Sequence, residues 1–338
     1  MESLLAQVHS ADTVQAQALN YLGILAANQG DYSYATLWLE KALSSCQALD
    51  NTTLTARVLN NLGCASMEQG LFRQAQGLFE ESFALKQSLN DPRSLACVLG
   101  NLGSLSYKQG EYTRARGQLE ESLLLAREAV DEEAICDALV DLGMVSYAQG
   151  EYSCARKVLE DGLAKARAIN YRRVIPQALG GLGRLISMSG DNAAAAALCT
   201  EAVGISSTVG DMEVNCHALQ DLAVVLRDQG LNRQAGDVYL QALLQSKASG
   251  LKANIAACLE GLGVVIATDG DSERAARLWG AADALRTTLQ APRSPIERAA
   301  YDASILIVRD LLGPERFMVL WNEGTAMTLE DCCTCAAK

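Results

Sequence analysis

Apolar residues recur along the chain at helical spacing, three, four and seven residues apart, and a glycine followed by Asp, Glu, Leu or Asn interrupts them at regular places. The spacing predicts amphipathic helices, and the interrupting glycine predicts a turn into the next helix. Around the second such glycine the pattern predicts one helix over residues 54–69 and another over residues 71–89, closed by Asn90, Asp91 and Pro92. The chain is therefore predicted to consist of helical hairpins.

The hairpins repeat with a period of forty residues. The segment LNNLGCASMEQG at 59–70 returns without insertion at 19–30, 99–110, 139–150, 179–190, 219–230 and 259–270. Self-similarity at a fixed period indicates a repeat architecture, in which each unit stacks on its neighbours. We therefore expect an all-α solenoid of helical hairpins, wound as a right-handed superhelix, in place of two or three globular domains.

Two positions in each unit favour glycine for different reasons. One closes the first helix, where a positive φ reverses the chain at little cost, and it falls at residues 30, 70, 110, 150, 190, 230 and 270. The other lies inside the first helix, twelve residues before an alanine of the second helix, and Ala223 is its one exception. A glycine inside a helix costs about 1 kcal/mol relative to alanine, so we interpret this position as a close approach of small residues on two helices.

The internal spacing resembles that of the tetratricopeptide repeat over residues 13–290. The pattern is Leu-x-x-Leu-Gly, a glycine seven residues on, and then Ala-x-x-x-large, as in Ala75 and Phe79. The period exceeds the usual value of about 34 and falls in the range of about 40–47 that is typical of HEAT repeats. The Gly and Ala spacing nevertheless favours the tetratricopeptide repeat, with six extra residues in the second helix and the junction. The proline that usually ends the motif is absent, which fits a longer second helix.

Both ends of the chain depart from the repeat. Residues 1–12 are predicted to be a half-repeat, the second helix of a truncated unit, because ESLLAQ echoes ESLLLAR at 121–127; an amphipathic capping helix is the alternative. After residue 290, Ser294 with Pro295 predicts one helix start, and Thr328 with Asp331 predicts another. Residues 291–338 are therefore expected to form C-terminal capping helices and a cysteine-containing tail.

Three C-terminal segments carry a more specific resemblance. AARLWGAADALR (275–286), SPIERAAYD (294–302) and LWNEGTAMTLEDC (320–332) are similar to the end of the repeat region in bacterial signalling ATPases of the STAND class, often joined to LuxR- or AfsR-type transcription regulators. The resemblance implies an attached NTPase module and a DNA-binding module in the parent protein. No G-x-x-x-x-G-K-[ST] stands in this sequence, so the chain itself would be the sensor and partner-binding arm. A free-standing scaffold that assembles other proteins or self-associates is the alternative.

Charge and composition limit the kinds of partner that this chain can bind. The balance of 28 Lys and Arg against 40 Asp and Glu gives a net charge of −12, which argues against direct binding of nucleic acid. The first residues lack a signal peptide's basic start and apolar core, and no apolar run reaches the roughly 18 residues of a membrane span. We therefore expect a cytoplasmic protein without membrane contact. Eight of the 11 cysteines stand singly in helical segments and are interpreted as reduced packing residues.

Neither a catalytic nor a metal-binding constellation is evident. The histidines are His9 and His217, and although His217 and Asp221 share a helix face, no nucleophile joins them, so we predict no enzyme and no cofactor. The CCTC segment at 332–335 offers three thiolates without a fourth ligand nearby, so a frayed tail is favoured over a zinc site. Three tyrosines that begin second helices are interpreted as packing residues: Tyr32, Tyr112 and Tyr152.

Function is expected on the concave wall, which first helices line in tetratricopeptide folds. The side chains predicted there to contact a protein, a peptide or a small inducer are Asn20, Arg57, Asn60, Asn61, Asn101, Tyr107, Asp137, Asp141, Tyr147, Arg184, His217, Asp221 and Arg227, with Ser104 and Gln177 beside them. An asparagine side chain offers a donor and an acceptor, which suits it to the backbone of an extended peptide. We expect Asn60, Asn61 and Asn101 to form a ladder along this wall, with Tyr107 and Tyr147 beside it, and to face solvent in the free protein. A merely solvated wall is the alternative.

Overall fold

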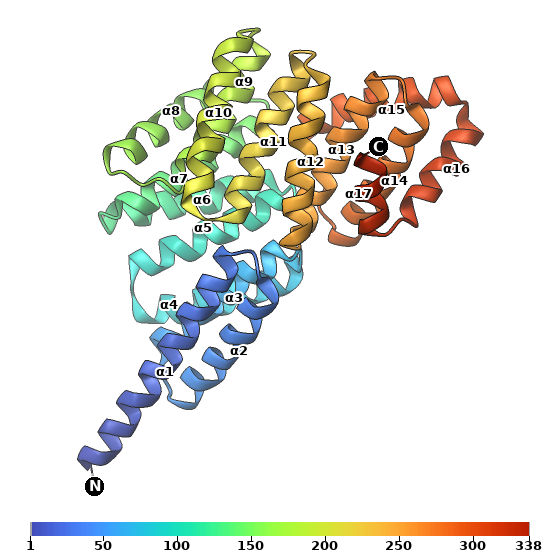
Figure 1. The fold of residues 1–338 in the computed structure, drawn as a ribbon. Helices are drawn as coiled ribbons and strands as arrows, with labels where there is room; N and C mark the ends of the chain where they lie inside the picture. The colour runs from blue at the N-terminus through green and yellow to red at the C-terminus, as the bar shows by residue number, and fades with distance from the viewer. Residues whose placement is uncertain (1, 338) are drawn as a thin grey trace.

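The computed structural model describes the backbone of residues 2–337 and the side chains of residues 12–337. Every regular element in this part of the chain is helical (Figure 1). The helices are α1 (Glu2–Asn28), α2 (Tyr32–Ala48), α3 (Thr52–Glu68), α4 (Phe72–Leu89), α5 (Pro92–Lys108), α6 (Tyr112–Glu128), α7 (Glu132–Ala148), α8 (Tyr152–Ala168), α9 (Ile175–Met188), α10 (Asn192–Val209), α11 (Met212–Asp228), α12 (Asn232–Ala248), α13 (Lys252–Thr268), α14 (Ser272–Leu289), α15 (Pro295–Leu312), α16 (Pro314–Thr325) and α17 (Leu329–Ala337).

The helices from α1 to α14 pair in chain order into seven hairpins, as the forty-residue period predicts. The glycine at each hairpin turn has a positive φ, between 75° at Gly230 and 97° at Gly270. In the second hairpin the first helix begins at Thr52, two residues earlier than predicted, because the side chain of Asn51 accepts a hydrogen bond from the Leu54 N–H at 3.0 Å and caps it. The predicted all-α solenoid of hairpins is confirmed.

The glycine inside a first helix, replaced by Ala223 in α11, does mark a close approach, but its neighbour differs from the prediction. A Cβ at Gly103 would lie 2.6 Å from Leu119 Cγ and 3.4 Å from the carbonyl oxygen of Ala115. At Gly143 the nearest atom is likewise Leu159 Cγ, at 2.6 Å. The glycine therefore makes room chiefly for the large residue that follows the alanine by four positions, and only secondarily for the alanine's backbone.

The first helices of the hairpins line the concave wall. Successive first helices, such as α5 with α7 and α9 with α11, contact one another more extensively than successive second helices do. Helices that form the inner side of a curved stack must lie closer together than those on the outer side. The wall that the sequence analysis assigned to the first helices is therefore the inner side of the solenoid.

The solenoid curves so strongly that the turns of the first three hairpins contact the segments that follow α12 and α14. Helices α3 to α5 therefore lie beside the end of α12 and the residues after α14 (Figure 1). A Cβ at Gly110 would lie 2.6 Å from Pro292 Cγ, and one at Gly30 would lie 2.7 Å from Ser249 Cβ. Leu289 crowds Gly70 in the same way. We call this the closure contact, formed by the turns at Gly30, Gly70 and Gly110 against Ser249, Leu289 and Pro292.

The N-terminal helix is longer than the repeat requires. α1 runs without a break from Glu2 to Asn28, so no turn separates residues 2–12 from the first unit, and its start projects away from the other helices (Figure 1). Met1 and the side chains of residues 1–11 lie outside the described part of the chain, as does the side chain of His9. The assignment of residues 1–12 to a truncated repeat therefore stays a prediction.

The C-terminal helix starts are confirmed. Ser294 Oγ accepts a hydrogen bond from the Glu297 N–H at 3.3 Å and caps α15. Thr328 and Asp331 cap α17 reciprocally, each side chain accepting from the other residue's N–H, at 3.2 and 3.0 Å. None of the helices in the described residues has the length and apolar character to cross a bilayer.

Helices α15 to α17 cover the last hairpin, and α16 crosses α14 very closely. Gly280 lies against the backbone of Trp321, and Gly324 lies against the backbone of Arg277, so a side chain at either glycine would separate the two helices. Trp279 is fully buried beneath this crossing. These contacts give a physical reason for the glycines of WGAAD and WNEGTAM.

The prediction of a frayed cysteine-containing tail is wrong. Residues 329–337 form α17, which packs against α12 and α14, and Cys332 and Cys333 belong to the core that surrounds Trp279. Cysteine behaves as a small apolar residue in a protein interior. The three cysteines among the nine residues of α17 therefore give this helix apolar side chains to bury against the core.

Candidate functional site

Asparagine side chains join successive first helices along the concave wall. Asn61 Nδ2 donates to Asn20 Oδ1 at 2.8 Å, and Asn101 Nδ2 donates to Asn60 Oδ1 at 2.9 Å. Each bond reaches back from one unit to the preceding unit, from α3 to α1 and from α5 to α3. The four asparagines therefore form two hydrogen-bonded pairs, which place Asn60, Asn61 and Asn101 on one wall together with Asn20.

The expectation that Asn60, Asn61 and Asn101 face solvent is wrong for Asn60, and Asn20 is buried as well. Asn20 is 2% exposed and Asn60 is 6% exposed, because each lies between its own helix and the first helix of the next unit. Asn61 and Asn101 are half-buried. Removing an amide from the ladder would leave a buried partner without its hydrogen bond, so these residues support the fold as well as the wall.

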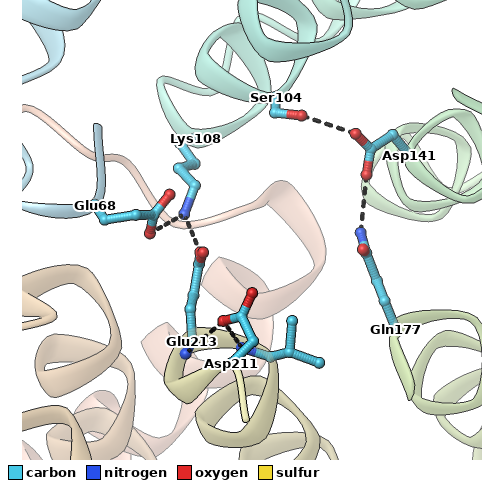
Figure 2. Close-up of polar contacts among 8 residues, drawn as sticks. Glu68, Ser104, Lys108, Asp141, Gln177, Asp211 and Glu213 are labelled. Atoms are coloured by element: carbon cyan, nitrogen blue, oxygen red, sulfur yellow. Dashed lines mark hydrogen bonds and ion pairs between the residues drawn. The ribbon is translucent and has the colours of Figure 1, made fainter. Parts of the chain in front are cut away.

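Carboxylates continue the wall beyond the asparagines. Asp141 on α7 accepts from Ser104 Oγ at 2.7 Å and from Gln177 Nε2 at 3.0 Å, and so links α5 to α9 (Figure 2). Asp137, one turn earlier, accepts from the Tyr171 hydroxyl at 3.0 Å. Burial raises the pKa of Asp137 to about 6 and also raises the pKa of Asp141.

Lys108 spans the inside of the solenoid. Its Nζ lies 2.7 Å from Glu213 Oε1 on α11 and 3.2 Å from Glu68 Oε2 on α3 (Figure 2). The three side chains are between 10% and 21% exposed, and together they carry one net negative charge when ionised. Burial and the neighbouring Glu213 raise the pKa of Glu68, whereas the two carboxylates outweigh the burial of Lys108 and raise its pKa.

A second group of charges gathers around Arg184 on α9. Its guanidinium lies 3.0 Å from Glu297 of α15 and 3.5 Å from Asp221 of α11, and its carbon lies 4.7 Å from the centre of the Tyr147 ring. Burial raises the pKa of Asp221, and Arg184 opposes that shift. The first capping helix therefore contributes a carboxylate to the concave wall.

The remaining predicted residues join these groups only in part. His217 is half-buried beside the carboxylates of Glu213 and Asp221, and it opposes the rise in the pKa of Asp221 that burial causes. Tyr107 packs edge-on against Tyr112, with ring centres 5.7 Å apart. Two predicted residues lie apart from the ladder: Arg57, which is exposed on α3, and Arg227, which pairs with its chain neighbour Asp228 at 2.8 Å.

Sequence reasoning missed the partners that come from distant units. Lys108 and Glu213 are 105 positions apart, and Arg184 and Glu297 are 113 positions apart, so neither pair follows from the forty-residue period. The wall as a whole presents amides, carboxylates and guanidinium groups at hydrogen-bonding distance from one another. Within the described residues no cluster of His, Cys, Asp and Glu is arranged to hold a metal ion. The chemistry that the wall offers is recognition by hydrogen bonds and charge.

Family models identify the repeat. Three models, each described as a tetratricopeptide repeat, match residues 15–49 and 55–94, residues 94–168, and residues 140–209. A search of curated proteins gives no match.

Solved structures with the same fold include three that superimpose well. The Rap conjugation gene regulator of the plasmid pLS20, in complex with the Phr* peptide, is 16% identical at a TM-score of 0.66, over 80% of this chain and 73% of its own. A Rap protein complexed with competence and sporulation factor is 11% identical at a TM-score of 0.60, over 96% of this chain and 98% of its own. Aspartyl phosphate phosphatase F from Bacillus subtilis is 14% identical at a TM-score of 0.52, over 77% and 72%. At these identities the likeness shows the fold.

Proposed function

We propose a recognition role for this chain, whose residues 15–49 and 55–209 belong to the tetratricopeptide repeat family and which folds as a solenoid of that type. In this role the chain is a non-catalytic interaction domain that binds a protein, a peptide or a small inducer on its concave wall. The observation that carries the proposal is the series of three hydrogen-bonded groups of amide, hydroxyl and carboxylate side chains that successive first helices place there, with bonds of 2.7 to 3.0 Å within each group.

The array suits a ligand that exchanges hydrogen bonds with the wall. An amide side chain can make several hydrogen bonds, and each asparagine of the ladder makes one or two of them within the protein. Asn61 and Asn101 can therefore still form hydrogen bonds with a peptide group. A neutral hydrogen bond contributes only about 0.5–1.5 kcal/mol, so affinity would come from several units acting together. An extended segment that follows the wall from α3 to α9 meets this requirement.

The structural neighbours support the same role. Both Rap structures were solved as complexes, one with the Phr* peptide and one with competence and sporulation factor. Because this chain shares their fold at low identity, the comparison supports a ligand on the solenoid and does not identify it.

The proposal extends to the parent protein. The segments that resemble the STAND-class signalling ATPases, often joined to LuxR- or AfsR-type regulators, lie within α14 to α17, and the glycines among them make the crossing of α14 and α16. We infer a cytoplasmic sensor arm of a larger bacterial regulator with attached NTPase and DNA-binding modules. The second candidate is a free-standing scaffold. Reading the gene upstream of Met1 separates the two, because a nucleotide-binding module in the same frame supports the regulator and a start at Met1 supports the scaffold.

A pair of matched double variants tests the concave wall. Asn61→Ala with Asn101→Ala removes two half-buried amides from the wall, and Gln47→Ala with Gln87→Ala removes two exposed amides from the second helices α2 and α4. The binding partner is first isolated by affinity capture. We expect calorimetry to show that the asparagine variant binds this partner about tenfold or more weakly than the parent, and that the glutamine variant binds it with parental affinity. Parental affinity in the asparagine variant, with a cooperative melting transition that shows it is folded, would show that the ligand binds elsewhere.

A further inference from the structure

The segment that joins α14 to α15 lies against units that are far apart in the sequence. We call residues 290–297 the strap. Ala291 is 3% exposed and shares a core cluster with residues of α3 to α5, and Pro292 packs on the turn between α5 and α6. Arg293 Nε lies 2.8 Å from Glu260 Oε1 on α13. The strap therefore contacts the second, third and seventh hairpins within a few residues.

The last two residues of the strap lie on the second half of the concave wall. Ile296 packs against the core cluster that contains Tyr147 of α7 and Leu182 of α9. Glu297 Oε1 accepts a hydrogen bond from Arg184 Nη2 at 3.0 Å. Tyr147 and Arg184 are among the residues that the sequence analysis placed on the wall to contact a ligand. The chain's own strap therefore occupies part of the predicted binding surface.

Glu297 uses only part of the hydrogen-bonding capacity of Arg184. The bond is made by Nη2 alone, and Asp221 lies 3.5 Å from Nη1. Arg184 Nε is buried and has no hydrogen-bond partner among the side chains and backbone of residues 12–337. An arginine binds a carboxylate most strongly through two parallel N–H groups. A carboxylate that reaches both Nε and Nη2 would therefore bind Arg184 more tightly than Glu297 does.

The strap can leave the wall without disturbing the core of the last hairpin. None of residues 295–300, the first turns of α15, is buried. The first buried residue of this helix is Tyr301, whose ring packs edge-on against Trp279 with the ring centres 5.8 Å apart. Detachment that stops at Tyr301 would therefore keep the cover over Trp279 and release only the strap and the start of α15.

We propose that Tyr147, Leu182 and Arg184 form a subsite for a peptide in which an aliphatic residue directly precedes an acidic one, and that the strap blocks this subsite until such a peptide displaces it. We call it the Arg184 subsite. It rests on the proposed function, because an interaction partner on the concave wall would be the source of the peptide. The aliphatic side chain takes the place of Ile296, and the carboxylate takes Nε and Nη2 of Arg184. Binding on the wall thereby releases the start of the first capping helix.

A peptide with the sequence of the strap, QAPRSPIERA (290–299), is the probe, and polarisation of an attached fluorescein reports its binding to the full chain. A short tether gives the strap an effective concentration of about a millimolar, so the parent should bind the probe weakly. Ile296→Ala with Glu297→Ala empties the subsite, and this opened variant should bind the probe at least about tenfold more tightly than the parent. Ile307→Ala with Asp310→Ala, at two exposed residues of the same helix, is the matched control and should bind like the parent.

Two comparisons show whether the probe occupies the Arg184 subsite. Adding Arg184→Ala to the opened variant, or replacing the glutamate of the probe by glutamine, should each weaken binding to the opened variant by about tenfold or more. Circular dichroism shows that each variant melts cooperatively. Equal affinities of the parent and the opened variant for the probe would overturn the proposal. Undiminished binding after either charge is removed would overturn it as well.

Hydrogen exchange of the parent chain gives a test without substitutions. The probe at about 10 mM, above the effective concentration of the strap, should speed exchange of the backbone amides of residues 296–300 and leave those of α16 unchanged. Unchanged exchange at residues 296–300 would contradict displacement. Asn61→Ala with Asn101→Ala, added to the opened variant, should not alter its affinity for the probe. Failure of the asparagine wall and failure of the Arg184 subsite are therefore distinguishable.

Discussion

Leu289 provides the most direct test of the closure contact. It ends α14, yet it is 5% exposed and shares a core cluster with Phe72 and Phe79 of the second hairpin. Replacing a buried leucine by alanine lowers the free energy of unfolding by about 2–5 kcal/mol, because the removed groups no longer contribute their free energy of burial and a cavity remains. At the edge of a hairpin the surroundings can partly collapse, so we expect Leu289→Ala to lower the free energy of unfolding by about 2–3 kcal/mol.

The repeat supplies a control at the same position of another unit. Leu89 ends α4 as Leu289 ends α14, but it is 41% exposed. Leu89→Ala should therefore cost less than about 1 kcal/mol. The difference between the two variants measures what the closure contact adds, since helix position and chemistry are shared.

Coupling between distant units distinguishes closure from ordinary packing. In a solenoid stabilised by neighbours alone, substitutions in the second and seventh units should be additive. We expect Phe72→Ala and Leu289→Ala to couple by about 0.5–3 kcal/mol, the range for residues in contact. Urea unfolding followed by circular dichroism measures each variant and the pair. Additivity within about 0.3 kcal/mol, or equal losses for Leu289→Ala and Leu89→Ala, would refute the reasoning.

Three further predictions concern packing and charge. Gly103→Leu should cost several kcal/mol by overpacking, whereas Gly117→Leu, where a Cβ meets nothing within 4 Å, should leave the melting temperature near that of the parent; equal melting temperatures would contradict the account of the interior glycine. Because burial raises the pKa of Asp137 from 3.8 to about 6, the folded chain holds this proton more tightly than the unfolded chain, and stability falls as pH rises through that window. Asp137→Asn should therefore flatten the dependence of melting temperature on pH between 4 and 7, and an unchanged slope would argue against it. Lys108→Ala leaves two carboxylates facing each other, so its loss of stability in urea should be larger at pH 8 than at pH 5, with partial recovery on adding Glu68→Gln.

The hairpins could be predicted from the sequence because their determinants are local. A turn at a glycine such as Gly70 depends only on the positive φ of that residue. A helix cap such as Ser294 depends only on a backbone N–H three residues further along the chain. The interior glycine was placed correctly but its neighbour was not. Packing four residues further along the second helix depends on how the two helices cross, which spacing alone does not specify.

The candidate site was predictable only where it follows the repeat. The ladder from Asn61 to Asn20 and from Asn101 to Asn60 joins adjacent units at almost the repeat distance, so consecutive wall positions sufficed to find it. Its burial was missed, because solvent exposure depends on the spacing of neighbouring first helices. The bridge from Lys108 to Glu213 depends on the curvature of the whole superhelix, a property that no single unit contains.

Departures from the repeat nevertheless record that curvature. The residue that begins each second helix is aromatic in the first four units and polar in the last three, in the order Tyr32, Phe72, Tyr112, Tyr152, Asn192, Asn232 and Ser272. Tyr32 and Phe72 are buried beside the turns that meet late junctions, whereas Tyr152, at a turn whose glycine has nothing within 4 Å of a Cβ, is 36% exposed. An aromatic ring at this position is therefore buried where another part of the solenoid covers the turn, and remains partly exposed at Tyr152, where nothing covers it. The burial of equivalent side chains, compared between units, therefore indicates which turns make contacts with units that are not their neighbours.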